Sequence, residues 1–481
     1  MTGEHVDTNE RMDATERMDA NEQLNLAARV LDLVRAAAGP GTQAEVSVDH
    51  YALALTRFAN SFIHQNVADT TTQVRVRLHA AGRTATGVTT LVDRDGLAGL
   101  VDRTVTALRH APADPGWAGL APPAVPGGAG GWDPATALAT PDERAQRVRA
   151  FVDAAGGLEA AGYVRTENWV GAFVNSAGQS VTGRTTQAAM DAIARTRGSD
   201  GVARLAATAL SDIDGAVLGA RAVAKARAGV DPVELPPGRY EVVLEPTAVA
   251  DLLSNLAIWG FNGKAYVERR SFVAPGEAQF DPSVTLVDDP VNGANVSLPY
   301  DAEGTPRRRL VLVEGGVSRA VAHDRRTAAK AGAESTGHAG AGSASWGPMP
   351  LNLRLEPASA AVGEVAEVAG PVADSSVAAL VADVRRGVLV TDLWYTRVLD
   401  PKSLVVTGLT RNGVWLIEDG EVTRPVANFR FTQSYPQALG PGAVLGVGAH
   451  ADALPGSWSI AQWTAPALRL AAWNFTGGAS G

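Results

Sequence analysis

The chain has 481 residues, and its 46% hydrophobic and 19% charged content is that of a folded globular protein too long for one ordinary hydrophobic core. Its 42 Lys and Arg against 51 Asp and Glu give a formal net charge of -9, which argues against nucleic acid or anionic lipid as a partner. The absence of cysteine excludes disulfides, thiolate nucleophiles and zinc sites that need sulfur.

The N-terminal 22 residues are polar and repeat the string Glu-Arg-Met-Asp-Ala at residues 10–14 and 16–20. They lack the apolar stretch that a signal peptide requires, and no apolar run elsewhere is long enough to span a bilayer. We therefore expect a disordered tail over residues 1–22, no membrane association and a cytoplasmic protein.

Residues 23–230 are expected to form an N-terminal α+β domain. Asn21 can cap a helix whose apolar residues follow helical spacing as far as Val34. Alternating polar and apolar residues over 44–55 and 74–78 predict half-buried antiparallel strands. Helices and strands of this kind favour a sandwich-like α/β arrangement.

The rest of this domain contains two further helices separated by a loop. The Gly/Pro-rich segment 111–135 cannot be a helix or a central strand, so it is expected to be a surface loop. A capping box at Thr140 predicts a helix from Pro141 to about Ala155. Ser211 is expected to cap a second helix that reaches about Ala228.

Residues 231–481 are expected to form a β-rich C-terminal domain, which begins after a proline-rich boundary at 231–237. One apolar helix follows the first strand, and the later segments are strand-like. Asn412-Gly413 and Asp419-Gly420 are pairs of the type that supplies positive φ angles in tight hairpins. The fold class predicted for the whole chain is α+β.

Familiar catalytic motifs are missing from the sequence. None of the eight histidines is followed by Glu, and no two lie at the helical spacing of a zinc-binding pair. The nucleophile elbow Gly-x-Ser-x-Gly and the phosphate-binding loop are absent as well. His338 is the most suggestive single residue, because it follows Ser335-Thr336-Gly337 in a glycine-flanked loop. From the residues alone, a polar side chain in a mobile surface loop is the preferred interpretation.

Ten short strings in one order resemble the TldD/PmbA family of peptidases, and in particular its PmbA (TldE) branch. The resemblance runs from about residue 44 to residue 445. The strings lie at residues 56–60, 82–84, 243–246, 270–272, 288–290, 301–305, 335–337, 408–413, 417–421 and 428–431.

For the catalytic subunit of this family, the resemblance implies a zinc helix of the form His-Glu-x-x-x-His after the first strand of the C-terminal, peptidase-like domain. The ligand positions fall approximately on Ser254, Asn255 and Trp259, none of which can replace the ligands. The family also implies a cysteine ligand, and the chain has none. No histidine lies between His110 and His323, so a shift of the alignment does not restore the site.

The leading hypothesis is a non-catalytic subunit of a two-component zinc metallopeptidase, which lines the substrate cavity while a TldD-like partner carries the zinc. The substrate would be a peptide or a peptide-like natural-product precursor. The expected substrate contacts in this chain are Arg57, Asn60, Ser335, Thr336, His338 and Arg411, with no catalytic and no metal-binding residue. Two alternatives stay open: a homo-oligomeric binding or scaffold protein, and an unrelated hydrolase that uses Ser335 and His338.

Overall fold

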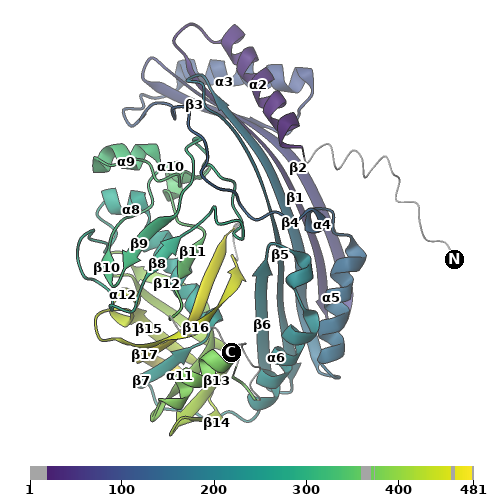
Figure 1. Ribbon diagram of the computed structural model, residues 1–481, viewed down its shortest axis with the longest axis vertical. Helices are drawn as coiled ribbons and strands as arrows, with labels where there is room; N and C mark the ends of the chain where they lie inside the picture. The colour runs from purple at the N-terminus through teal and green to yellow at the C-terminus, as the bar shows by residue number, and fades with distance from the viewer. Residues whose placement is uncertain (1–18, 359–369, 373, 457–460, 479–481) are drawn as a thin grey trace, which may run out of the picture.

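The computed structural model describes residues 19–358, 370–372, 374–456 and 461–478, which form two domains side by side (Figure 1). The N-terminal domain is built on one long, curved sheet, and the C-terminal domain is dominated by strands. The α+β class predicted from the sequence is therefore confirmed. Within the described ranges, no helix is both long enough and apolar enough to cross a membrane.

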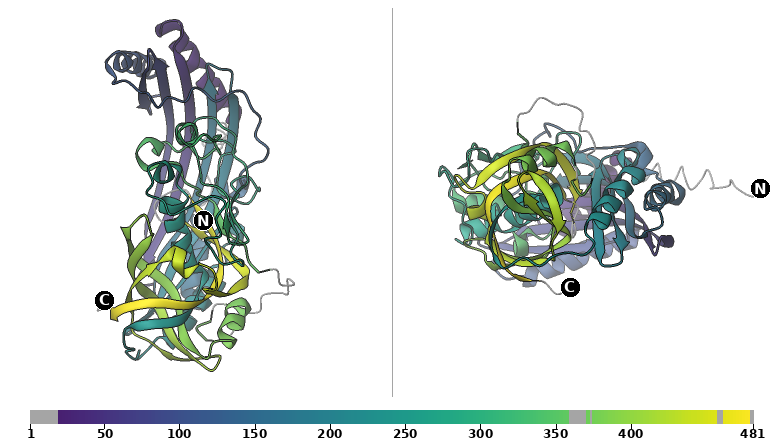
Figure 2. Two further views of the ribbon diagram at one scale, coloured as in Figure 1. Left: turned by 90° about the vertical axis from the view of Figure 1, so that its left-hand side faces the viewer. Right: turned by 90° about the horizontal axis from the view of Figure 1, so that it is seen from below.

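The N-terminal sheet has six antiparallel strands in the order β3-β2-β1-β4-β5-β6. Its central strands are long and pair along nearly their whole length, so the sheet is an extended platform (Figure 2). The strands are β1 (Gln43–Ala59), β2 (Phe62–Ala80), β3 (Arg83–Thr89), β4 (Glu159–Asn175), β5 (Ser180–Thr196) and β6 (Ser199–Ala207).

One face of this sheet is apolar and is covered by helices. Side chains alternate between the two faces of a strand, so even-numbered residues of β1 such as Val46, Val48 and Phe58 share this face. The helices are α2 (Ala20–Ala37) and α3 (Arg94–His110), which cover one end of the sheet, and α5 (Pro141–Ala154) and α6 (Gly215–Ala228), which cover the other. A short helix, α4 (Pro134–Ala137), precedes α5.

The opposite face of the sheet is polar and faces the C-terminal domain (Figure 1). Arg77 forms an ion pair with Glu303 of that domain, and Gln187 donates a hydrogen bond to Gln462. The polar side chains of this face include Glu45, Ser47, Asp49, Arg75, Arg77, Arg165, Glu167 and Gln187.

Five strands of the C-terminal domain close into a ring, in which β7 pairs with both β12 and β17 (Figure 2). The ring strands are β7 (Gly238–Leu244), β12 (Arg386–Asp400), β13 (Val405–Glu418), β15 (Phe429–Ser434) and β17 (Gln462–Gly478). The other strands are β8 (Leu286–Asp288), β9 (Leu310–Glu314), β10 (Val317–Ser318), β11 (Leu353–Leu355), β14 (Glu421–Pro425) and β16 (Val444–Pro455). The helices are α7 (Pro246–Asn255), α8 (Gly263–Val267), α9 (Arg325–Ala331), α10 (Ser343–Trp346), α11 (Ser375–Ala382) and α12 (Tyr435–Ala438).

Two buried ionic contacts join the domains. Lys225 of α6 lies 2.5 Å from Glu245, which directly precedes α7, and both side chains are almost completely buried. Arg204 of β6 bridges Asp191 of β5 and Asp392 of β12, with N–O distances of 2.9 Å to each. Lys225, Glu245 and Asp392 are buried, whereas Arg204 and Asp191 keep 20% and 28% of their side chains exposed. Because a buried charge is costly without a partner, these pairings favour one fit of the two domains.

Three local predictions differ from the structure. The cap of α2 is Asp19 rather than Asn21, so residues 20–22 belong to the helix, while the rest of the expected tail lies outside the described residues. The cap of α6 is Asp214, whose carboxylate accepts two backbone N–H bonds, and Ser211 lies in a preceding single turn. In both helices the N-cap is an aspartate directly before the first helical residue, and not the nearby residue predicted from the sequence.

Asn412-Gly413 does not form the predicted hairpin but lies inside the continuous strand β13. The register between β12 and β13 shifts at this point, so the positive φ angles of the pair produce a bulge. A Cβ atom on Gly413 would lie 2.0 Å from the Trp415 ring, which accounts for glycine there. Asp419-Gly420 does connect β13 to β14, as predicted.

We predict that Lys225→Met lowers the free energy of unfolding by about 3 to 5 kcal/mol, because it leaves the Glu245 carboxylate buried without its cation. Urea denaturation followed by tryptophan fluorescence measures this change. Lys330→Met, at an exposed position on α9, is the matched control. Adding Glu245→Met to Lys225→Met should recover part of the loss. An effect no larger than that of the control would contradict the role assigned to the pair.

Candidate functional site

The segment from β7 to α8 contains the helix on which the sequence analysis places a lost metal site. Strand β7 ends at Leu244, and Pro246 occupies the first turn of α7, where its missing N–H is not needed. The helix continues into a π-helical turn over Leu256–Gly260 before α8. Leu252, Leu253 and Leu256 are fully buried in the core of the C-terminal domain.

The residues at the expected ligand positions do not fit a zinc ion. Asn255 donates its side-chain amide to the Asp251 carbonyl at 2.9 Å, and Trp259 is partly buried against the core. Ser254 is half-buried and offers a neutral hydroxyl. Among the residues that the structure describes, no three His, Asp or Glu side chains come together as metal ligands would.

Asp251 is a partly buried carboxylate on the same helix, one turn before these positions. It accepts hydrogen bonds from the Tyr435 hydroxyl at 2.7 Å, from the Thr396 hydroxyl at 2.8 Å and from the Asn255 amide at 3.2 Å. Burial raises the pKa of Asp251 to about 6, although the bonds from Tyr435 and Thr396 lower it. The sequence analysis did not identify Asp251 as a candidate. The signal for it in the sequence is that it is the single acidic residue of an otherwise apolar helix.

An exposed aromatic patch on β12 lies beside this helix. We call the side chains of Trp394, Tyr395 and Leu399 the β12 patch; they are 47%, 63% and 60% exposed. The Thr396 hydroxyl that binds Asp251 comes from the same stretch, so the patch and α7 are directly connected. The Arg411 guanidinium lies 4.5 Å from the Trp394 ring centre, and that of Arg397 lies 4.1 Å from the Tyr395 ring centre.

The residues predicted to contact substrate fall in three separate places. Arg57 and Asn60 lie at the end of β1 and in the turn to β2, and both are exposed. Ser335, Thr336 and His338 lie together near the start of β1, because Asp301 and Glu303 connect their loop to that end of the sheet. A strand advances by roughly 3.3 Å per residue, so the two groups are roughly 40 Å apart along β1.

The third place is a groove between the domains that contains Arg411. It is lined by residues at the β5–β6 hairpin, including Arg195 of β5 and Ser199 of β6, and by Asn412 and Asn428 of the C-terminal domain. Arg411 therefore lies at the same end of the sheet as Arg57 and Asn60, which are separated from the groove by β4 and β5, and far from the Ser335–His338 loop. It adjoins the β12 patch through its contact with Trp394.

The interpretation of His338 as part of a mobile surface loop is wrong, because the side chain is completely buried. Its Nε2 lies 2.9 Å from Asp288 Oδ2, and its Nδ1 lies 2.9 Å from the Thr336 hydroxyl. The same hydroxyl accepts the His323 backbone N–H at 2.7 Å. The Asp, His and hydroxyl order resembles a hydrolase relay, but burial leaves no access for a substrate. The network instead holds the loop in place.

A sequence model of the PmbA/TldA metallopeptidase C-terminal domain matches residues 237–477. A metalloprotease of Methanothermobacter thermautotrophicus is 26% identical over 210 residues, which is 42% of each chain. An uncharacterized protein of Methanocaldococcus jannaschii is 36% identical over 104 residues, which is 21% of this chain and 25% of that protein. The chain therefore spans less than half the length of the curated relatives that it matches.

Solved structures share the whole architecture. TldE from Thermococcus kodakarensis superposes with a TM-score of 0.78 at 19% identity, covering 95% of this chain and 100% of that one. A putative modulator of DNA gyrase from Thermotoga maritima gives a TM-score of 0.77 at 18% identity, covering 94% of this chain and 99% of that one. At this level of identity the likeness demonstrates a shared fold.

We predict that Asp251→Asn changes the dependence of stability on pH. The folded chain keeps this proton up to about pH 6, whereas the unfolded chain releases it near the ordinary value of 3.8. Wild type therefore loses free energy of unfolding as the pH rises between these values, by about 3 kcal/mol for a pKa difference of about two. Relative to wild type, the variant should gain about that amount between pH 4 and pH 7.

Urea denaturation of both proteins across this pH range gives the difference. Asp153→Asn, at an exposed position on α5, is the control and should track wild type at every pH. A constant difference between wild type and Asp251→Asn from pH 4 to pH 7 would show that the Asp251 carboxyl titrates normally.

Proposed function

This chain belongs to the TldD/PmbA family of metallopeptidases, and we propose that it is the metal-free subunit of a two-component peptidase. In this proposal a TldD-like chain supplies the zinc and performs the hydrolysis. This chain completes the cavity in which a peptide, or a peptide-like natural-product precursor, is held.

The observation that carries the proposal is the state of α7. The helix occupies the place where the family's zinc ligands are expected, yet its side chains there are used for packing and for internal hydrogen bonds. Asp251, the one carboxylate on this turn, already accepts bonds from Tyr435, Thr396 and Asn255. The sequence supports the same view, since it has no cysteine and no histidine between His110 and His323.

The β12 patch is the surface proposed to receive the partner. Tryptophan, tyrosine and arginine are the side chains most enriched at the energetic centres of protein interfaces. Here Trp394 and Tyr395 are each paired with an arginine and remain largely exposed. A partner bound at this patch would lie next to α7, and the proposed substrate cavity would form between the two chains.

In this proposal the residues predicted to contact substrate have different roles. Arg411 lies at the β12 patch and is the best placed of them to reach a peptide held between the two chains. His338, being buried, would position the Ser335–Thr336 loop instead of contacting substrate. Arg57 and Asn60 lie at the far end of β1 from that loop and would contact only a long substrate.

The proposal predicts that the isolated chain binds no stoichiometric zinc and hydrolyses no peptide, and that hydrolysis appears when a zinc-bearing TldD-like chain is added. Elemental analysis of each purified chain and a peptide-cleavage assay of the mixture test this. Stoichiometric zinc together with hydrolysis by the isolated chain would overturn the proposal. A stable homo-oligomer that ignores the second chain would favour the scaffold alternative.

A second prediction concerns the partner surface. Trp394→Ala and Tyr395→Ala should each weaken binding to the TldD-like chain by roughly thirtyfold, which corresponds to about 2 kcal/mol for an interface centre. Trp346→Ala removes a tryptophan on α10 that is even more exposed, at 71%, and is the control. Calorimetric titration measures the affinities. Equal losses in all three variants, or in none, would place the interface elsewhere.

A further inference from the structure

One edge of the N-terminal sheet is open over much of its length. Strand β2 pairs with β1 along nearly its whole length, but β3 pairs with β2 only from Val74 onward. Among the described residues, the backbone of residues 62–73 therefore has a strand partner on one side only. The opposite edge strand, β6, lies against β13 and β16 of the C-terminal domain. An edge with unpaired N–H and C=O groups can accept a further strand.

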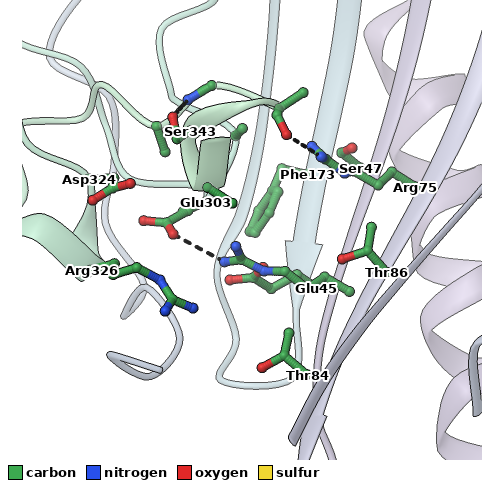
Figure 3. A pocket seen from close by; sticks show the side chains of 16 residues that line it. Glu45, Ser47, Arg75, Thr84, Thr86, Phe173, Glu303, Asp324, Arg326 and Ser343 are labelled. Atoms are coloured by element: carbon green, nitrogen blue, oxygen red, sulfur yellow. Dashed lines mark hydrogen bonds and ion pairs between the residues drawn. The ribbon is translucent and has the colours of Figure 1, made fainter. Parts of the chain in front are cut away.

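The C-terminal domain contacts β2 beyond this open stretch. Arg75 donates a hydrogen bond to the Ala341 carbonyl, and Arg77 forms an ion pair with Glu303, beside a small pocket between the domains (Figure 3). In contrast, every residue from 64 to 70 is exposed. Because neighbouring residues of a strand point to opposite faces of the sheet, both faces of β2 are open here. Neither the helices nor the C-terminal domain covers this part of the edge.

The open stretch lacks the devices that usually protect an exposed edge. Such edges commonly carry lysines, prolines or bulges, but residues 62–73 contain no Lys, Arg or Pro. The one shift of register between β1 and β2 lies at Arg57, and from Gln65 to Gln73 the pairing is regular. Val67 and the threonines at 70–72 favour extended backbone. This part of β2 is therefore a regular strand that is open to pairing.

The side chains along the edge indicate which strand would fit. Val67 and Asp69 lie on the same face of the sheet, and Asp69 is the only acidic residue of a stretch that has no Lys or Arg. A strand added antiparallel, like the others in this sheet, would place residues two positions apart opposite Asp69 and Val67. A basic residue opposite Asp69 and an apolar residue opposite Val67 are favourable cross-strand pairs. A second copy of this chain, with its net charge of -9, is a poorer match.

We propose that the free edge of β2 binds an extended basic peptide segment, which joins the sheet as a further antiparallel strand along residues 65–73. Backbone hydrogen bonds would supply affinity, and Asp69 and Val67 would select a basic residue followed two positions later by an apolar one. The site lies at the opposite edge of the sheet from the groove that contains Arg411, so it would hold peptide away from the proposed place of hydrolysis. The inference concerns the isolated chain and does not rest on the proposed partner.

The mode of binding can be tested on the isolated full-length chain. The probe is a fluorescent, end-blocked peptide of alternating serine and threonine, with lysine and then valine at two central positions separated by one residue. Fluorescence anisotropy measures its affinity, and hydrogen exchange followed by mass spectrometry should show slower exchange at residues 65–73 when the peptide is bound.

Two versions of the peptide, N-methylated on alternate residues, separate backbone pairing from side-chain binding. Only every second N–H of an added strand faces the sheet, so one version should bind like the parent peptide and the other at least about tenfold more weakly. Equal affinities of the two versions, or no binding of the parent peptide, would overturn the proposal. So would a dimer of the chain alone, seen by sedimentation, in which residues 65–73 are already protected.

Charge reversal at the edge locates the site. Asp69→Lys should weaken binding of the lysine peptide roughly fivefold and strengthen binding of a counterpart with glutamate in place of lysine. Asp102→Lys, at an exposed position on α3, is the matched control and should bind both peptides like wild type. Circular dichroism checks that each variant is folded. If Asp69→Lys does not fold, Asp69→Asn decides the question, because it should remove the preference for the lysine peptide. A wild-type preference in either folded variant would exclude this edge.

Discussion

The arrangement of the two domains depends on the polar face of the long N-terminal sheet. Its polar side chains are covered by the second domain and need hydrogen-bond or ionic partners there. One face of the sheet is apolar and is covered by four helices, but the other carries acids, arginines and amides that a second domain covers. Covering charged groups is unfavourable unless each gains a partner. The contacts of Arg204 with Asp392 and of Lys225 with Glu245 meet this requirement, and they also define how the domains fit together.

The same requirement is met unevenly along the sheet. Near α6 and β6 the interdomain charges form close ion pairs. This end of the interface therefore holds the two domains together. Near the start of β1, Glu45 Oε1 is buried without a hydrogen-bond partner among the described residues, and the half-buried Arg75 donates a hydrogen bond to the Ala341 carbonyl. Among the described residues, Glu245 Oε1 at the other end is likewise buried without a hydrogen-bond partner, so neither end of the interface satisfies every buried oxygen.

Local chemistry predicted much of the fold, and tertiary context decided the rest. Helical spacing and the capping box at Thr140 located α2 and α5, because such signals act within a few residues. The glycine residues were interpreted less accurately. Gly337 suggested a mobile loop, but a Cβ atom there would lie 2.7 Å from the Pro306 carbonyl oxygen, so the residue permits close packing. Burial of His338 against Asp288, 50 residues away, leaves no local trace in the sequence.

In helix α7, the residues that determine the fold and the residues that could bind a metal are different side chains. The strand, the proline at the first helical turn and the buried leucines follow from requirements of folding. The polar side chains on the turn around Asp251 meet a different requirement: a polar group removed from water needs a hydrogen-bond partner. Tyr435, Thr396 and Asn255 meet it for that carboxylate with hydrogen bonds from neutral groups. Helix α7 therefore has the framework of the family's fold while the polar side chains on this turn bind one another, and the proposed metal-free role rests on that internal pairing more than on the identity of any single residue.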